Sequence, residues 1–231
     1  MNKIKALLTS CLLFSVTSHA ALISSYDFNG TLTDTLGNGA QLIDNGGVIN
    51  AGRYDFGLGQ GLAFDVSSLF GVNDSYAIEM RFKSIDGWSG YNRLIDWSDL
   101  NSDYGLYVYN NTATIYDSGS RGPASFINNK DITLGFEYNS LTQYGNLYLN
   151  GSHVGGWLNN GSFDLDSNLN HISFFEDDKY EEFTGSVDFI RFHDDASTFS
   201  SQPSVQPISS PTTIAIFAFS LMALSLRRIK V

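Results

Sequence analysis

Alternating apolar and polar residues along the chain predict short β-strands. In segment 77–83, Ile78, Met80 and Phe82 point to one face and the charged residues between them to the other, which is the period of a half-buried strand. No segment carries a sustained helical period. Many short strands separated by turns are typical of a β-sandwich or a barrel. We expect further strands over residues 103–110, 132–138, 146–150, 171–175 and 187–193.

Segment 103–110 matters because its two predicted faces differ in chemistry. Leu106 and Val108 belong to one face, and Tyr107 and Tyr109 belong to the opposite one. The aliphatic face is expected to enter the core, as alternate residues of a strand point to opposite sides of the sheet.

Turn residues separate the predicted strands. Pairs such as Asn110-Asn111 and Asn150-Gly151 suit tight turns, and the chain is rich in glycine, with 22 residues, but has only 4 prolines. Such residues tolerate the backbone conformations that tight turns require. With 231 residues, the chain has room for one domain with appendages.

The N-terminal 20 residues read as a signal peptide. Lys3 and Lys5 precede an apolar stretch over residues 6–16, and the small residues around Ala20 predict cleavage after it, which is the pattern of a secretory signal. Cys11 is the only cysteine and lies inside this segment. The exported protein is therefore expected to have no disulfide and no thiolate metal site.

The C-terminal end has the pattern of a membrane segment. A proline-containing linker is expected over residues 197–211, followed by an uncharged stretch from residue 212 to residue 226 and then Arg227, Arg228 and Lys230. As a helix this stretch would span about 22 Å, short of a bilayer core of about 30 Å, although basic flanks can snorkel. The basic cluster would stay cytoplasmic and leave the domain outside.

The same C-terminal residues, 212–231 with the preceding Ser209-Ser210-Pro211, resemble a PEP-CTERM sorting signal. Such signals combine a proline motif, a short apolar helix and a terminal arginine cluster. The resemblance implies processing by an exosortase-type enzyme and export to the cell surface or extracellular matrix, with transient anchoring in the membrane. Ser209-Ser210-Pro211 stands where Pro-Glu-Pro is usual, which leaves the identity of the processing enzyme open.

The net charge of the predicted domain excludes some classes of binding partner. All 24 acidic residues lie between Asp27 and Asp195, with only eight of the 13 basic residues, so the predicted domain carries a net charge of −16. Such a surface repels nucleic acid and anionic lipid. It is compatible with calcium, whose ligands are oxygens, and equally with acidity that only keeps an exported protein soluble.

The order of the segments over residues 21–196 resembles the laminin-G-like, concanavalin A-like superfamily. The resemblance implies an all-β jelly-roll sandwich of two antiparallel sheets, with about six or seven strands in each. It does not imply one function, because this fold hosts lectins, glycanases, lyases and adhesive modules. The matching segments are 26–30, 34–39, 61–65, 76–82, 147–151 and 183–192.

A glycanase-like string occurs at residues 176–181. Glycanases of this fold commonly carry Glu-x-Asp-x-x-Glu on a strand, where alternation would bring the carboxylates to one face. Here the string begins at Glu176 and ends at Glu181, but its interior is polar and it follows the strand predicted to end at Phe175. We therefore expect an exposed loop and no enzyme. The histidines at 153, 171 and 193 are scattered and suggest no catalytic set.

Calcium is a possible cofactor at the same loop. Asp177, Asp178 and Glu182, with Glu181, place four carboxylates within six residues. Unpaired, these carboxylates repel one another, and a cation would relieve the repulsion. The alternative is a solvated acidic loop.

A second acidic loop has the start of a calcium-binding pattern. Asp99, Asn101 and Asp103 have the required spacing, as in the first half of an EF-hand loop. Tyr104 and Asn110 then stand where a glycine and a glutamate are needed. The segment is not an EF-hand, and turn formation is the alternative interpretation.

Aromatic residues supply the candidate ligand-binding site. Trp88, Tyr91, Trp97 and Trp157 lie near glycine-rich segments, and flat rings can stack on sugar faces. Core packing is the alternative for each of them. The sequence thus favours an exported, non-catalytic protein that binds a polysaccharide or another matrix component. The alternatives are a structural surface or biofilm matrix protein with protein partners, and a polysaccharide-degrading enzyme.

Overall fold

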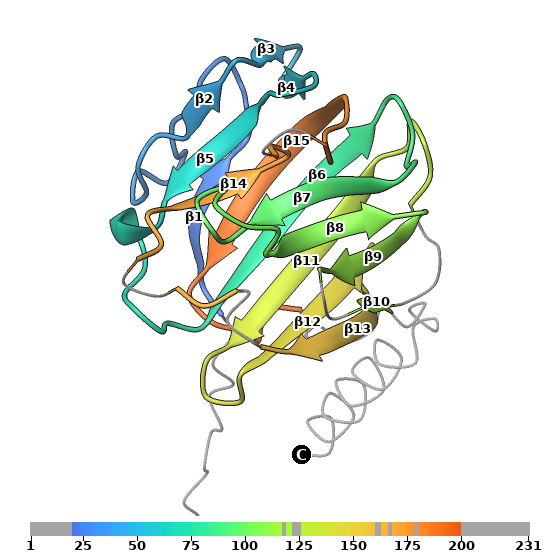
Figure 1. The fold of residues 1–231 in the computed structure, drawn as a ribbon. Helices are drawn as coiled ribbons and strands as arrows, with labels where there is room; N and C mark the ends of the chain where they lie inside the picture. The colour runs from blue at the N-terminus through green and yellow to red at the C-terminus, as the bar shows by residue number, and fades with distance from the viewer. Residues whose placement is uncertain are drawn as a thin grey trace, which may run out of the picture. The chain divides into compact units, whose positions relative to one another are not determined.

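Two antiparallel sheets face each other and enclose the core of the domain (Figure 1). The computed structural model describes residues 20–116, 119–121, 126–159, 163–165, 168–177 and 180–199. All of them belong to the first of the chain's two structural units, residues 1–201. The predicted all-β sandwich is confirmed. Within the described residues the only helical element is one short 3₁₀ turn, η1 (Val66–Ser68).

The eight-stranded sheet has the order β13-β12-β11-β6-β15-β4-β3, with β1 paired to β15. Its central strands are the long ones, in agreement with the alternating pattern that predicted them. The strands are β1 (Leu22–Tyr26), β3 (Val48–Asn50), β4 (Arg53–Phe56), β6 (Tyr76–Ser84), β11 (Ile132–Asn139), β12 (Tyr144–Leu149), β13 (Ser152–Leu158) and β15 (Gly185–His193).

The seven-stranded sheet has the order β10-β9-β8-β7-β14-β5-β2. It lies toward the viewer in Figure 1 and carries the candidate site on its outer face. The strands are β2 (Ile43–Asn45), β5 (Gly61–Asp65), β7 (Tyr91–Asp96), β8 (Gly105–Tyr109), β9 (Thr112–Ile115), β10 (Gly119–Arg121) and β14 (His171–Phe174).

Aromatic side chains from both sheets fill the space between them. Phe64 of β5 stacks on Phe192 of β15 with ring centroids 4.2 Å apart, and Phe56 of β4 stacks on Phe175 at 4.7 Å. Such pairs add about 0.5–1.5 kcal/mol beyond the burial of their area. A domain without a disulfide can therefore hold its two sheets together through ring packing.

Two predicted turns are confirmed by their backbone conformation. Asn110 and Asn111 connect β8 to β9, and Asn150 and Gly151 connect β12 to β13; all four have positive φ. Positive φ at both central residues is the geometry that a two-residue hairpin favours, because it matches the twist of the flanking strands.

The sequence pattern missed strand β7. Residues 91–96 contain Asn92, Arg93 and Asp96, which are polar yet buried, so the segment shows no simple alternation. A register shift between Arg93 and Ile95 further interrupts its pairing with β8. The period of two therefore could not mark this strand.

The domain extends beyond residue 196, the end that the sequence pattern predicts. The backbone N–H of Phe199 donates to a carboxylate oxygen of the buried Glu137. The Phe199 ring also lies 5.4 Å from the ring of Tyr148. Residues 197–199, assigned above to the linker, thus pack on the eight-stranded sheet.

The segments expected to be the signal peptide and the sorting signal lie outside the part of the chain that the structure describes, apart from Ala20. Residues 1–19 and 200–231 lie outside the described residues. Over the part of the chain that the structure describes, no helix has the length and apolar character needed to cross a membrane.

Candidate functional site

The outer face of the seven-stranded sheet, called here the open face, is built on a row of paired residues. Ile43 of β2 pairs with Ala63 of β5, Ala63 with Ser173 of β14, and Ser173 with Asp96 of β7. Directly paired residues of an antiparallel sheet present their side chains to the same face. The small side chains of Ala63 and Ser173 leave room above the sheet.

A hollow of about 430 Å³ lies above this row. The loop after β7 forms one wall, and β2 with the residues that follow β14 form the other. The lining is rich in amides and carboxylates, groups that bond to hydroxyls. It consists of Ile43, Asp44, Asn45, Ala63, Asp99, Leu100, Asn101, Asn170, His171, Ser173 and Glu176.

Hydrogen bonds fix the walls of the hollow. Both carboxylate oxygens of Asp99 accept bonds, one from the backbone N–H of His171 at 2.7 Å and the other from the backbone and side chain of Asn170. On the opposite wall of the hollow, the side-chain amide of Asn45 donates a hydrogen bond to a carboxylate oxygen of Glu176. Burial and the nearby charges of Asp96 and Glu182 raise the pKa of Glu176 above its ordinary value.

Beside the hollow, four tyrosines gather on β7, on β8 and at the residue that follows β9. Tyr91 stacks on Tyr109 with ring centroids 4.3 Å apart, and Tyr107 and Tyr116 approach Tyr91 edge-on. Tyr91, Tyr109 and Tyr116 are 38%, 37% and 40% exposed. This tyrosine cluster offers apolar ring surface with polar hydroxyl ends, a combination that suits wet binding sites.

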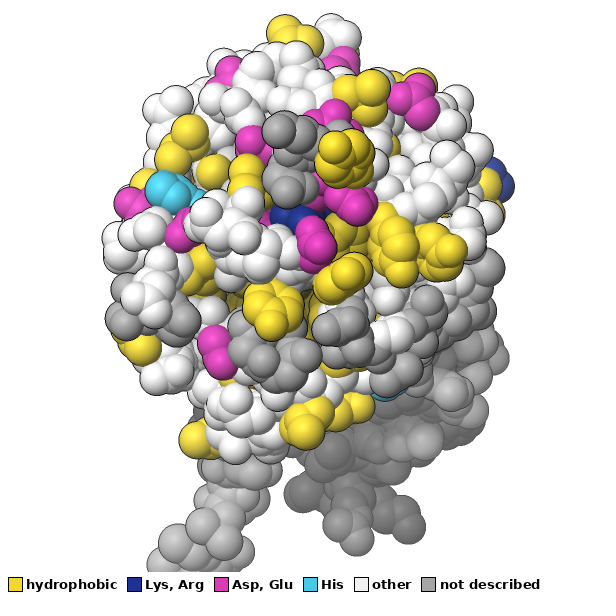
Figure 2. Space-filling view, viewed as in Figure 1, with side chains coloured by type: hydrophobic (Ala, Val, Ile, Leu, Met, Phe, Trp, Pro, Cys, Tyr) yellow, Lys and Arg dark blue, Asp and Glu magenta, His cyan; other side chains and the backbone are white. Residues whose placement is uncertain are grey.

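Arg93 lies between the hollow and the tyrosine cluster and is completely buried. Its Nε lies 2.7 Å from Asp177, its Nη1 2.7 Å from Asp96 and its Nη2 3.5 Å from Asp103. The guanidinium carbon lies 5.0 Å from the centroid of the Tyr107 ring. One guanidinium thus joins two loops and a strand. Figure 2, which looks onto this face, shows acidic side chains around a basic one, with hydrophobic side chains beside them.

Glu181 adds another carboxyl group to this cluster. Burial, together with the hydrogen bond to Asp177 and the negative charges of Asp177 and Asp103, raises the pKa of Glu181 to about 7. Its backbone carbonyl accepts a bond from the N–H of Arg93 at 2.8 Å. Near neutral pH, the charge of the open face therefore changes with the protonation of this residue.

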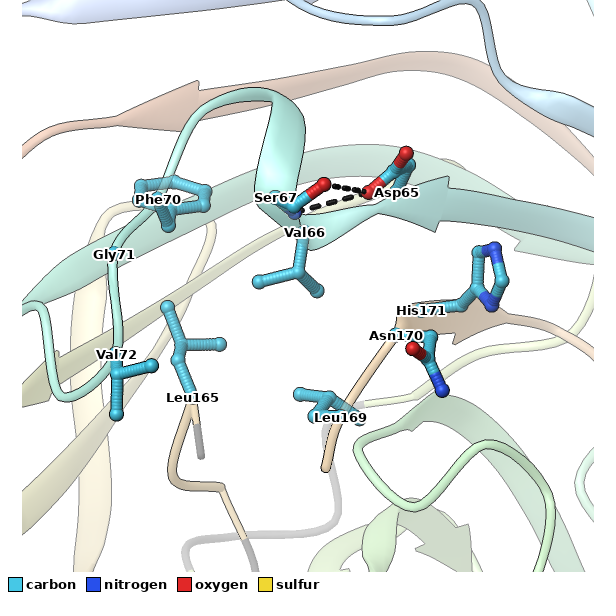
Figure 3. A pocket seen from close by; sticks show the side chains of 10 residues that line it. All are labelled: Asp65, Val66, Ser67, Phe70, Gly71, Val72, Leu165, Leu169, Asn170 and His171. Atoms are coloured by element: carbon cyan, nitrogen blue, oxygen red, sulfur yellow. Dashed lines mark hydrogen bonds between the residues drawn. The ribbon is translucent and has the colours of Figure 1, made fainter. Parts of the chain in front are cut away.

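A second hollow, of about 390 Å³, lies between η1 on one side and Leu165 and Leu169 on the other. Aliphatic side chains surround it, among them Val66, Leu165 and Leu169 (Figure 3). On its rim, Asp65 and Ser67 bond to each other. Four of its ten lining residues are polar, against eight of eleven in the first hollow, so the first hollow is the better candidate for a polar ligand.

Three of the four predicted ligand-binding aromatics are core residues, which corrects the prediction that their rings are available to a ligand. Trp88, Trp97 and Trp157 are 5%, 4% and 1% exposed. Trp88 packs against Phe82, Phe126 and Phe183, and Trp97 packs against Phe136 and Phe163. Trp157 donates its indole N–H to the carbonyl of Gly119 at 3.1 Å. Large apolar rings gain more from burial than from exposure.

Tyr91 is the one predicted aromatic that reaches the open face. Its partners Tyr107 and Tyr109 were predicted to share the face opposite to Leu106 and Val108, and the aliphatic pair is indeed in the core. That alternation was the sequence signal for the tyrosine cluster. Arg93 had no such signal, because two of its three carboxylate partners, Asp103 and Asp177, come from separate loops.

Of the three predicted calcium ligands, the structure describes Asp177 and Glu182. One oxygen of Asp177 lies against Arg93, and the other accepts the backbone N–H groups of Tyr180 and Glu181. Asp178 lies outside the described residues, and Glu182 is half-buried. Among the described residues there is no group of three or more His, Asp or Glu side chains placed to hold a metal ion. Calcium binding stays a prediction.

The loop of the glycanase-like string differs from the exposed loop expected above. Asp177, in its interior, is buried by its contact with Arg93. The three histidines of the domain lie apart: His171 is in β14 of the seven-stranded sheet, whereas His153 and His193 are in strands of the other sheet.

Comparisons with known proteins bear on the fold. No protein-family model matches the chain, and no curated protein sequence matches it either. Among solved structures, domain 4 of AbnA, an extracellular arabinanase from Geobacillus stearothermophilus solved with arabinotriose, is similar with a TM-score of 0.59 and 16% identity. The match covers 79% of this chain and 98% of that one.

Two further structures are similar over part of their length. The sialidase of Trypanosoma rangeli, solved with sialic acid, matches with a TM-score of 0.59 and 15% identity, over 78% of this chain and 31% of that one. The binding domain of botulinum neurotoxin serotype D matches with a TM-score of 0.56 and 16% identity, over 78% and 52%. The chain therefore shares the two-sheet β-sandwich fold of these three proteins.

Proposed function

We propose that the chain is an exported, non-catalytic glycan-binding domain and that its binding site is the open face. The observation that carries this proposal is the exposed stack of Tyr91 and Tyr109 beside a hollow lined with amides and carboxylates. Ring surface contacts the apolar C–H groups of a sugar, and the polar lining bonds to its hydroxyls.

The solved structures of similar fold support the same proposal. The AbnA domain was solved with arabinotriose and the sialidase with sialic acid. These ligands belong to those proteins, but they show that sandwiches of this shape occur in proteins that bind sugars. For this chain, its own tyrosines and hollow carry the proposal.

The proposal that the domain is not catalytic rests on the contacts made by carboxyl groups of residues 176–181. Asp177 holds Arg93, Glu176 accepts a bond from Asn45, and Glu181 is bonded to Asp177. These contacts give each of these three carboxyl groups a role in fixing the loop. The purified domain should therefore bind polysaccharide without cleaving it, as a reducing-end assay on β-glucan and arabinan would test.

Export and C-terminal sorting form the remaining part of the proposed function. The signal-peptide pattern of residues 1–20 and the basic-flanked apolar tail 212–231 support it. Deleting residues 212–231 should release the domain into the medium. Identical fractionation of the truncated and full-length chains would contradict sorting through the tail.

A binding assay with matched variants tests the site. Tyr109→Ala removes a tyrosine of the open face, and Tyr144→Ala removes a tyrosine of similar exposure, 39%, from β12 of the other sheet. On a glycan array and by calorimetry, Tyr109→Ala should lose roughly tenfold in affinity, about 1.4 kcal/mol, whereas Tyr144→Ala should bind normally. Concentration-dependent self-association with no glycan signal would instead favour a structural matrix protein.

A further inference from the structure

Building on the proposed glycan binding, we propose that the open face holds the interior of a neutral glycan chain, which lies diagonally from the tyrosine cluster to the hollow. The two parts share one face of one sheet, so a single extended ligand can contact both. Their separation sets the ligand's length, and the charges between them set its chemical class.

Sheet geometry gives the separation. Tyr109 lies on β8 and Ala63 on β5, and in the sheet order β8-β7-β14-β5 these strands are three steps apart, or about 14 Å at the usual strand spacing. Along β7, Tyr91 belongs to the tyrosine cluster and Asp96 to the row beneath the hollow. These two residues are five positions apart, which adds about 16 Å along the strand. The diagonal is therefore about 20 Å, a length that an extended chain of roughly four sugar units would span.

A ligand of this length cannot be recognised through one terminal sugar. Neither part of the face is an enclosed pocket that would select a chain end: the tyrosine cluster is open surface, and the hollow is bounded by β2 on one side and by the loop after β7 on the other. A chain can therefore enter and leave at both ends of the diagonal.

The charged groups that the structure describes between the two parts favour a neutral ligand. Arg93 is buried and already lies against Asp96 and Asp177, so its charge is not available to an anion. The Asp103 side chain is about half exposed, and Glu181 is half-buried beside it. Carboxylates accept bonds from sugar hydroxyls but repel uronate or sulfate groups.

Ladders of oligosaccharides from two to six units test this inference by calorimetry. The probes are arabino-, xylo-, cello- and manno-oligosaccharides, with oligogalacturonates as the anionic comparison. At least one neutral ladder should gain affinity up to about four units and then level off, and galacturonates of equal length should bind at least roughly tenfold more weakly.

Two variants separate the parts of the site. Tyr109→Ala removes the aromatic part, and Ala63→Trp fills the floor of the hollow. Each should reduce the affinity for the six-unit ligand toward that for the two-unit ligand, whereas Tyr144→Ala should leave the length dependence unchanged. Asn101→Ala, at the wall of the hollow, replaces Ala63→Trp if the latter lowers Tm.

The outcomes distinguish this inference from the function on which it rests. Affinity that does not depend on length, or equal binding of galacturonates, would overturn the inference and leave glycan binding intact. Failure of every ladder to bind would overturn both.

Discussion

The Nε atom of Arg93 lies 2.7 Å from a carboxylate oxygen of Asp177, and both side chains are completely buried. Arg93 belongs to β7, whereas Asp177 belongs to the loop that follows β14. The contact therefore fixes this loop against the open face. Asp96, also buried, holds the same guanidinium at 2.7 Å.

Removing the carboxylate of Asp177 should destabilise the domain strongly. Asp177→Asn leaves Arg93 buried with one close carboxylate fewer, and breaking a buried pair costs about 3–5 kcal/mol. Asp103→Asn is the control, because this partner is partly exposed at 3.5 Å and should cost less than about 1 kcal/mol. Urea unfolding measures both, and equal midpoints for the two variants would contradict the role given to Asp177.

Glu181 should make stability depend on pH near neutrality. Its pKa in the folded protein is about 7, against an ordinary value of 4.5, so the folded state binds the proton more tightly than the unfolded state. The resulting stability is fully present below about pH 4.5 and is lost as the pH rises through 7. Glu181→Gln should remove this contribution.

The measurement is the difference in Tm between wild type and Glu181→Gln from pH 4.5 to 8. The comparison is needed because burial and Arg191 lower the pKa of His193 to about 4. That shift acts in the opposite direction, since stability is lost as the pH falls from about 6.5 toward 4. A Tm difference that stays constant over this range would contradict the prediction for Glu181.

Trp157 should matter for stability and not directly for binding. Its ring is buried and its indole N–H bonds to Gly119, so Trp157→Ala should cost about 3–5 kcal/mol. The folded fraction of the variant should retain wild-type affinity for a bound glycan. Loss of affinity with unchanged Tm would show that this ring contacts the ligand.

Calcium binding at the loop of Asp177, Asp178 and Glu182 can be tested by melting. An ion that binds only the folded state would raise stability by about 2.7 kcal/mol at a hundredfold excess over Kd. Because Asp177 is engaged by Arg93, Asp178→Asn and Glu182→Gln are the informative variants. Identical melting curves in calcium and in EDTA would eliminate this site.

Much of the fold could be predicted from local patterns. Ile78, Met80 and Phe82 alternate with charged residues, and all three are in the core. The pairs Asn110-Asn111 and Asn150-Gly151 form the turns expected of them. Strand period and turn conformation depend on neighbouring residues, so a sequence contains them directly.

The candidate site could be predicted only in part. The sequence grouped Tyr107 with Tyr109 on one face, because alternation along a strand determines the facing of its residues. It could not tell that Trp88, Trp97 and Trp157 are core residues while Tyr91 is exposed, since all four are aromatic residues near glycines. Burial is decided by the packing of distant strands, which local pattern does not show.

By itself, the sequence determined that the chain forms short strands and turns, which of their faces are apolar, and that the domain is strongly acidic. Only the tertiary structure decided that Arg93 meets Asp96, Asp103 and Asp177, and that Ile43, Ala63, Ser173 and Asp96 line up beneath a hollow. The physical reason is that sheet order and register bring together residues far apart in the chain, and these are set by the burial of the whole core.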